Sequence, residues 1–255
     1  MQPAISTLVV YKNRFGNLVK ILEENFRIQN WEIIDEGFHG LDEKKIVRLR
    51  DLASTQNLKY AVHAPFSSIN LAEANPTLRG RFVEFMKESL EKTYKLEASI
   101  WVVHPGRLTP FTLFFPEEAW KAQIDALKSL VKEANKVGVK VVVENMIGVY
   151  SVFKTVEDGI KILENVEDIG ICLDVGHANV TGVLEEFIKK VPAVQHIHVH
   201  DNHGVEDEHL AAGDGTIDWD WFVEQLKKIK YRGWIVAENY ELKDSIKTLE
   251  RLKLV

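Results

Sequence analysis

Short apolar runs rich in β-branched residues recur along the chain and alternate with longer segments in which apolar residues return every three or four positions. The short runs are typical of buried strands and the longer segments of amphipathic helices. Eight runs predict strands, at residues 4–11, 31–37, 59–65, 99–106, 139–146, 169–177, 194–201 and 233–240. Helical spacing is clearest in residues 18–26, 44–54, 78–96, 117–138 and 221–230. This alternation predicts an α/β fold with parallel strands.

The alternation continues to the end of the 255 residues without a linker rich in proline, glycine or serine, so we expect a single domain over residues 1–255. Eight βα units in about 250 residues match the size of a (β/α)₈ TIM barrel. The structural alternative is a doubly wound open sheet. The first βα turn lacks the G-x-G-x-x-G pattern of the dinucleotide-binding sheets, which favours the barrel.

Nearly every predicted strand begins with apolar residues and ends in a side chain that can bind a metal ion or a proton. In chain order these side chains are Glu36, His63, His104, Glu144, Asp174 with His177, His198 and Glu238. The carboxyl ends of all strands of a TIM barrel meet at one mouth, where active sites lie. The sequence therefore predicts a cluster of carboxylates and imidazoles at that mouth.

Taken alone, each of these residues has an ordinary structural explanation. Glu144 could cap a loop, Asp174 could cap the next helical turn, and for Glu36 we favour a structural role. Together, however, these groups would repel one another or stay without partners unless a cation neutralised them. Carboxylates and imidazoles suit Zn²⁺, Mn²⁺, Co²⁺ or Fe²⁺. The single cysteine, Cys172, is judged too deep in its predicted strand to be a ligand.

Residues 194–202, VQHIHVHDN, place three histidines at alternate positions. On a strand, His196, His198 and His200 share one face, while Ile197 and Val199 share the other. Hydrogen-bonded core histidines would give the same pattern as a metal-binding face. The other polar strand ends favour the metal-binding face.

Composition and charge limit the compartment and the partners that we expect for the protein. The chain carries a net charge of -6, and its single cysteine excludes a disulfide framework and fits a reducing compartment. No apolar run is long enough to span a membrane, and no basic region precedes the first apolar run, so we expect a cytoplasmic protein. The excess of acid argues against broad nucleic-acid binding through the overall field.

The ordered motifs resemble the xylose-isomerase-like TIM barrels, which include sugar isomerases and epimerases together with endonuclease IV. The resemblance covers essentially the whole chain. It rests on HAPF (63–66) followed by NL (70–71), VVHPG (102–106), VVVEN (141–145), CLDVGHAN (172–179), HVHDN (198–202), DEHLAAGDGTIDW (207–219) and IVAEN (235–239).

The resemblance implies a metal site with one to three ions. The tagatose-epimerase-like branch holds one divalent ion with the counterparts of Glu144, Asp174, His198 and Glu238, of which Glu144 and Glu238 would also exchange the substrate proton. The endonuclease IV branch holds three zinc ions, and its further ligands have counterparts in His63, His104, His177, Asp207 and His209. By position His198 is the ligand of the histidine strand, His200 and Asp201 line the rim, and His196 is a buried, hydrogen-bonded residue.

Two functions follow from the two branches. The complete ligand set favours a polynuclear phosphoesterase site. Other features argue against DNA as the substrate. The first loop YKNRFGNLVK and the segment after Glu144 depart from the endonuclease IV pattern, and Phe66 stands where the loop tyrosine of that pattern is expected. We therefore expect a metal-dependent isomerase or epimerase of a small sugar or sugar-like polyol, with no duplex DNA or membrane as partner. The oligomeric state is left open.

For substrate binding we nominate Phe66, Arg107 and His200, with Arg107 as the contact for an anionic group. Aromatic residues near strand ends could stack on a sugar or merely pack; they are Phe38, Phe66, Tyr150, Trp219 and Trp221.

Overall fold

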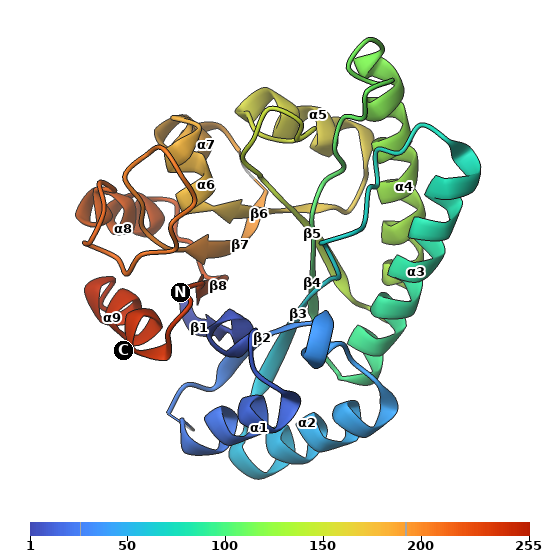
Figure 1. The fold of residues 1–255 in the computed structure, drawn as a ribbon. Coiled ribbons are helices and arrows are strands. Elements are labelled where there is room, and N and C mark those ends of the chain that lie inside the picture. The colour runs from blue at the N-terminus through green and yellow to red at the C-terminus, as the bar shows by residue number, and fades with distance from the viewer. Residues whose placement is uncertain (26, 192) are drawn as a thin grey trace.

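The computed structural model describes residues 1–25, 27–191 and 193–255, and within these ranges eight parallel strands close into a barrel surrounded by helices (Figure 1). The strands are β1 Gln2–Ser6, β2 Asn30–Ile34, β3 Lys59–His63, β4 Ile100–Val103, β5 Lys140–Glu144, β6 Gly170–Asp174, β7 Val194–Val199 and β8 Trp234–Ala237. Each strand pairs with the next one along the chain, and β1 pairs with β8 to close the ring. The predicted single TIM barrel is confirmed.

The helices form the outer layer of the barrel (Figure 1). They are α1 Phe15–Glu24, α2 Glu43–Gln56, α3 Pro76–Lys95, α4 Pro116–Val137, α5 Val156–Asn165, α6 Val175–Val180, α7 Leu184–Lys190, α8 Trp219–Lys228 and α9 Leu242–Arg251, with the 3₁₀ helices η1 Thr7–Val10 and η2 Gly37–His39. Several begin at clear sequence signals, such as the Asn75 cap before Pro76 and the capping box of Thr155 and Asp158. No helix in the described part of the chain is both long and apolar enough to cross a membrane.

The predicted strands differ from the observed ones mainly at their ends. The first was expected at residues 4–11, but β1 ends at Ser6, whose hydroxyl accepts a hydrogen bond from the Leu8 amide and starts η1. The sixth was expected at residues 169–177, but β6 ends at Asp174, which caps α6 by accepting from the His177 amide at 2.7 Å. Phe26, the last residue of the predicted helical segment 18–26, lies outside the described residues.

The histidine strand behaves as its alternation predicts. Ile197 and Val199 on β7 belong to the large apolar core, whereas His196 and His198 contact carboxylates of other strands across the barrel interior. Ile197 and Val199 thereby anchor β7 in the core, and His196 and His198 point into the barrel interior.

Candidate metal centre

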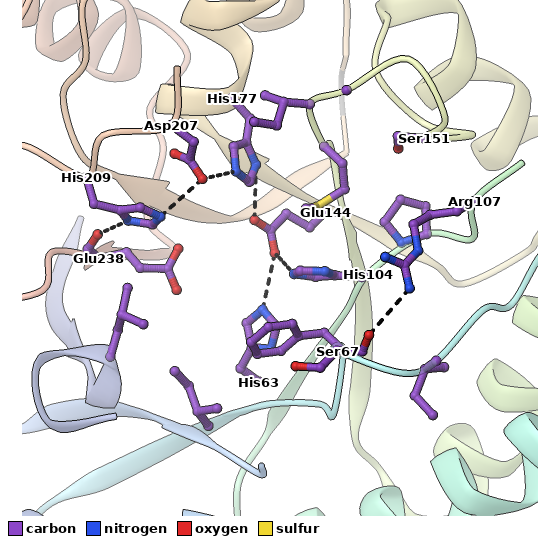
Figure 2. Close-up of a pocket in the computed structure, with 18 of the residues that line it drawn as sticks. His63, Ser67, His104, Arg107, Glu144, Ser151, His177, Asp207, His209 and Glu238 are labelled. Carbon is purple, nitrogen blue, oxygen red and sulfur yellow. Dashed lines mark hydrogen bonds and ion pairs between the residues drawn. The ribbon is translucent and has the colours of Figure 1, made fainter. Parts of the chain in front are cut away.

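The predicted ligands gather at the carboxyl ends of the strands, around the mouth of the barrel (Figure 2). His63, Glu144 and Asp174 are the last residues of β3, β5 and β6, and Glu238 directly follows β8. Because all strands are parallel and end on the same side, these side chains meet although they are far apart in the sequence.

Glu144 occupies the centre of the cluster (Figure 2). Its Oε2 lies 3.4 Å from His63 Nε2 and 3.3 Å from His104 Nε2. Its Oε1 lies 3.4 Å from both His177 Nδ1 and His198 Nδ1. A single buried carboxylate therefore joins imidazoles from four separate segments.

A second group surrounds His198. Its Nδ1 faces three carboxylates, with Glu238 Oε2 at 3.3 Å, Glu144 Oε1 at 3.4 Å and Asp174 Oδ2 at 3.9 Å. The side chain of His198 is completely buried, so these approaches occur away from bulk water. This is the four-residue set that the resemblance assigns to a single divalent ion.

A third group connects α6 with the long loop between β7 and α8. Asp207 Oδ2 lies 3.2 Å from both His177 Nε2 and His209 Nε2 (Figure 2). His209 holds a left-handed backbone conformation, with φ of 51°, which is uncommon for a residue other than glycine. Such conformations persist where the surrounding structure determines them, often at functional sites.

Three of the histidines are oriented by main-chain carbonyls. The Nδ1–H groups of His63 and His177 donate to the carbonyls of Ala64 and Asn145, each at 2.9 Å, and Nδ1–H of His209 donates to the carbonyl of Glu238. Because a carbonyl can only accept, the proton of each neutral ring must lie on Nδ1. When these rings are neutral, their Nε2 lone pairs are therefore directed into the cluster, as metal-binding histidines require.

The charges of the cluster balance one another. Burial opposes ionisation of Glu238 and Glu144, but His198 outweighs it, lowering the pKa of Glu238 to about 2 and holding that of Glu144 well below its ordinary value. Burial also opposes protonation of His63 and His177, yet the facing carboxylates raise their pKa values to about 9 and about 10. Ionised carboxylates thus face protonated imidazoles, and a cation bound here would displace protons from the rings.

Several buried polar atoms of the cluster have no hydrogen-bond partner among the described residues, including Glu144 Oε2, His198 Nδ1 and Asp207 Oδ1. Buried polar atoms without partners are costly, which is why they often mark a bound ion or an active site. All three are oxygen or nitrogen donors from carboxylates and imidazoles, the donor set expected for Zn²⁺ or Mn²⁺. The residues present therefore fit a divalent cation.

A cavity of about 700 Å³ opens above the cluster. His63, Glu144 and Glu238 lie in its floor, and apolar side chains such as Leu8, Ile34, Phe66, Ile69 and Met146 form much of its wall. Arg107, predicted to contact substrate, also lines it and lies in Figure 2 on the side away from Asp207 and His209. Its guanidinium makes one long contact, at 3.4 Å, with the Ser67 carbonyl, and pairs with no carboxylate of the described residues.

The structure corrects the prediction that His200 and Asp201 line the rim. Both side chains are fully buried, and neither borders the cavity. His200 Nε2 lies 3.1 Å from Asp174 Oδ1, and Gly176 packs so closely against its ring that a methyl group would not fit there. Asp201 accepts hydrogen bonds from the Gly213 amide and from Trp219 Nε1, each at 2.8 Å, and so anchors the following loop.

Cys172 and Glu36 also differ from the simple pattern of polar strand ends. Cys172 was set aside as too deep, but its sulfur lies within 4.8 Å of ligand atoms of Glu144 and His198. Glu36 has the structural role favoured for it, because its Oε2 accepts from the amides of Phe66 and Ser67 at 3.1 and 3.3 Å.

The five aromatic residues near the strand ends fall into two groups, those that line the cavity and those that do not. Phe66 and Tyr150 line the cavity, and Phe66 packs against His63 and His104 with ring centroids 5.2 and 5.0 Å apart. Phe38, Trp219 and Trp221 do not border the cavity, and Trp219 is buried in the core.

Sequence reasoning missed Glu32, a fully buried carboxylate in the middle of β2. Its Oε1 lies 3.0 Å from His198 Nε2, and its Oε2 lies 2.7 Å from His196 Nε2. The available signal was an acidic residue inside the apolar segment WEII, in a chain that also carries a strand with histidines at alternate positions. His196 itself is buried and hydrogen-bonded, as predicted.

The sequence of this chain is similar to those of known proteins. A family model described as xylose isomerase-like TIM barrel matches residues 26–253. An uncharacterized protein of Methanocaldococcus jannaschii is 34% identical over 261 residues, covering 99% of this chain and 88% of that protein. A probable endonuclease 4 of Halothermothrix orenii is 28% identical over 223 residues, covering 79% of this chain and 76% of that protein.

Solved structures give the same fold. That of a D-tagatose 3-epimerase-like protein has a TM-score of 0.93 and 34% sequence identity, covering 99% of this chain and 96% of that one. That of the IolI protein with a bound zinc atom has a TM-score of 0.81 and 20% identity, covering 99% and 95%. Relatives of this chain are therefore named after sugar epimerases and after an endonuclease.

Proposed function

The chain belongs to the xylose isomerase-like TIM barrel family, and from this membership we propose that it is a divalent-metal-dependent isomerase or epimerase of a small sugar or sugar-like polyol. The Glu144, Asp174, His198 and Glu238 side chains hold the essential cation in this proposal. His63, His104, His177, Asp207 and His209 extend the site to further ions, for a total of one to three.

The observation that carries the proposal is the convergence of two ionised glutamates on one imidazole at the floor of a cavity. Glu144 and Glu238 come from β5 and β8 and approach the same nitrogen of His198, at 3.4 and 3.3 Å. Two carboxylates of this kind can act as acid and base on one substrate carbon. The low pKa values of both groups favour the ionised, proton-accepting form.

A bound divalent cation would polarise a substrate carbonyl and its neighbouring hydroxyl and thereby acidify the C–H bond between them. One glutamate then removes that proton as a base. In epimerisation the other glutamate, after taking up a proton from solvent, returns it to the same carbon from the opposite face, and the first glutamate releases its proton to solvent. In aldose–ketose isomerisation the proton returns on the same face to the neighbouring carbon.

The cavity supports a small substrate. Its volume of about 700 Å³ and its partly apolar wall suit a sugar or polyol whose polar end reaches the cluster. Phe66 packs against the carbon face of the substrate, and Arg107, free of a carboxylate partner among the described residues, contacts an anionic or hydroxyl group at the other end.

The test is a metal-dependent proton exchange. Chelator-treated protein is reloaded separately with Zn²⁺, Mn²⁺, Co²⁺ or Fe²⁺ and incubated with a panel of ketoses, aldoses and keto-inositols in D₂O. We expect deuterium at the carbon next to the carbonyl, together with an epimer or isomer, only in samples that contain both metal and protein. Metal salts alone serve as the control. Absence of exchange with every substrate and metal would contradict the proposal.

A second candidate is a phosphoesterase with a trinuclear zinc site, acting on abasic-site DNA or a phosphorylated small molecule. The specific observation in its favour is the third group, in which Asp207 joins His177 and His209 at 3.2 Å. A single-ion sugar enzyme has no evident need for that group. Hydrolysis of bis-p-nitrophenyl phosphate by the same reloaded samples, without deuterium exchange on sugars, would favour this candidate.

A further inference from the structure

His198 differs from the other oriented histidines in the nitrogen that it presents to the cluster. His63, His177 and His209 are held through Nδ1 by main-chain carbonyls and direct Nε2 toward carboxylates. Although His177 Nδ1 also lies 3.4 Å from Glu144 Oε1, it donates to the Asn145 carbonyl at 2.9 Å. His198 directs Nδ1 toward Glu144 and Glu238 instead. Its Nε2 faces the Glu32 carboxylate, whose Oε1 lies 3.0 Å away. The two atoms lie at ion-pair distance without the alignment of a hydrogen bond, and each lacks another hydrogen-bond partner among the described residues.

We propose that Glu32 is a positioning residue that keeps the proton of His198 on Nε2, so that the Nδ1 lone pair is available to the divalent cation. Glu32 does not border the cavity, and its ion-pair contacts among the described residues are to His196 and His198, so it acts on the proposed cation through the His198 imidazole. This inference rests on the metal site of the proposed function and adds a residue that lies beneath it.

The surroundings of Glu32 suit this role. Its second oxygen accepts a hydrogen bond from His196 Nε2 at 2.7 Å, which fixes the carboxylate on the side away from His198. The ring of His196 in turn packs against Trp234, with centroids 6.2 Å apart, deeper in the barrel. Trp234, His196, Glu32 and His198 thus form a continuous line of contacts from the barrel interior to the cluster.

Both oxygens of Glu32 face an imidazole, with Oε1 3.0 Å from His198 Nε2 and Oε2 2.7 Å from His196 Nε2. An ionised carboxylate is an obligate acceptor, so it can hold the Nε2 proton but cannot offer one in its place. Carboxylates behind ligand histidines fix the tautomer and raise the basicity of the ring in this way.

The first test measures metal affinity without substrate. Metal-free wild type, Glu32→Gln and Glu32→Asp are titrated with Zn²⁺ against a competing chelator. Glu36→Gln is the matched control, because this glutamate follows the same strand but contacts only loop amides. We expect Glu32→Gln to weaken the tightest site about 10- to 100-fold, Glu32→Asp to restore part of the loss, and Glu36→Gln to bind like wild type. Wild-type affinity in a folded Glu32→Gln protein would overturn the inference.

The second test needs no substitution at Glu32. Long-range ¹H–¹⁵N correlation spectra of Zn²⁺-loaded wild type report which nitrogen of each histidine carries the proton. His198, assigned by the loss of its signal in His198→Gln, should be protonated on Nε2, whereas His63, His177 and His209 should be protonated on Nδ1. A proton on Nδ1 of His198 would overturn the inference even if Glu32→Gln does not fold. Failure of wild type to bind Zn²⁺ would overturn the proposed function as well, whereas equal binding by wild type and Glu32→Gln would remove only this inference.

Discussion

Glu144 and Glu238 are chemically identical but differ in how many partners they hold. Glu144 faces His63, His104, His177 and His198 at once, whereas Glu238 faces His198 and receives a long contact, at 3.5 Å, from the Ser6 hydroxyl. Loss of charge at Glu144 therefore disturbs the whole cluster. The same loss at Glu238 disturbs one side of it.

This difference predicts different outcomes for two isosteric substitutions. We expect Glu238→Gln to lower kcat about 10²- to 10⁴-fold, the usual contribution of a general acid or base, and to weaken metal binding, because Glu238 is one of the proposed ligands of the essential cation. Glu144→Gln should lose both activity and metal, because it removes the charge shared by four imidazoles. Metal content and kcat are measured on the same preparations, with the melting temperature as a check on folding. Retention of most of the activity by either variant would contradict the catalytic assignment.

At the level of single residues, the sequence could predict those side chains that occupy regular positions. His63, Glu144 and Asp174 end their strands, and alternation along β7 separates the inward His196 and His198 from the outward Ile197 and Val199. Glu32 could not be found in this way, because it lies in mid-strand and its partners are 164 and more residues away. His200 was misplaced because α6 packs over it through Gly176, a contact that no local pattern encodes.

Among the elements, the loop between β7 and α8 carries the third group of ligands. It is tied down by side chains outside that group: Asp201 accepts from the amides of Gly213 and Ile217, and Asn239 donates to the carbonyls of His209 and Leu210. Asp207 and His209 are therefore not the main supports of the loop. Their side chains instead meet each other and His177 at the cluster.

Because other residues hold the loop, we predict that the Asp207 and His209 side chains can be removed without changing the conformation of the loop. We expect wild type to bind more than one equivalent of Zn²⁺ and an Asp207→Ala/His209→Ala double mutant to bind fewer, with little change in melting temperature. Asp214→Ala is the control, since Asp214 lies on the same loop but pairs with the exposed Lys247. Elemental analysis after gel filtration gives the stoichiometry. One equivalent in both wild type and double mutant would rule out the polynuclear site and leave a single-ion sugar enzyme.

For the molecule as a whole, periodicity was sufficient to predict the barrel, because each buried strand and each amphipathic helix leaves its own local pattern. The location of the mouth followed from the same pattern, since carboxylates and imidazoles gather at the carboxyl ends of the strands. The loops that shape the cavity were harder to predict. Arg107 and Ser151, for example, meet in an isolated antiparallel bridge between the loops after β4 and β5, which local sequence does not specify.

The charge distribution of the whole molecule bears on the choice between sugar and DNA. The chain has a net charge of -6, and in the described residues Arg107 is the only arginine or lysine that lines the cavity. A protein that grips a duplex neutralises several phosphates with basic side chains, and its affinity falls steeply as salt rises. A relative is named probable endonuclease 4. The negative net charge of this chain nevertheless creates an electrostatic field that repels a polyanion such as DNA.

We therefore predict weak binding of Zn²⁺-loaded protein to a short duplex that contains an abasic site, and negligible incision of that duplex. Fluorescence anisotropy at 50 and 200 mM salt measures the binding and its salt dependence, and denaturing gels measure strand cleavage, with an authentic endonuclease IV as the positive control. The few basic groups at the mouth should give a shallow salt dependence, because few counterions are released. Efficient incision that weakens steeply with salt would show that local loop charges outweigh the overall field, and would make the phosphoesterase the correct function.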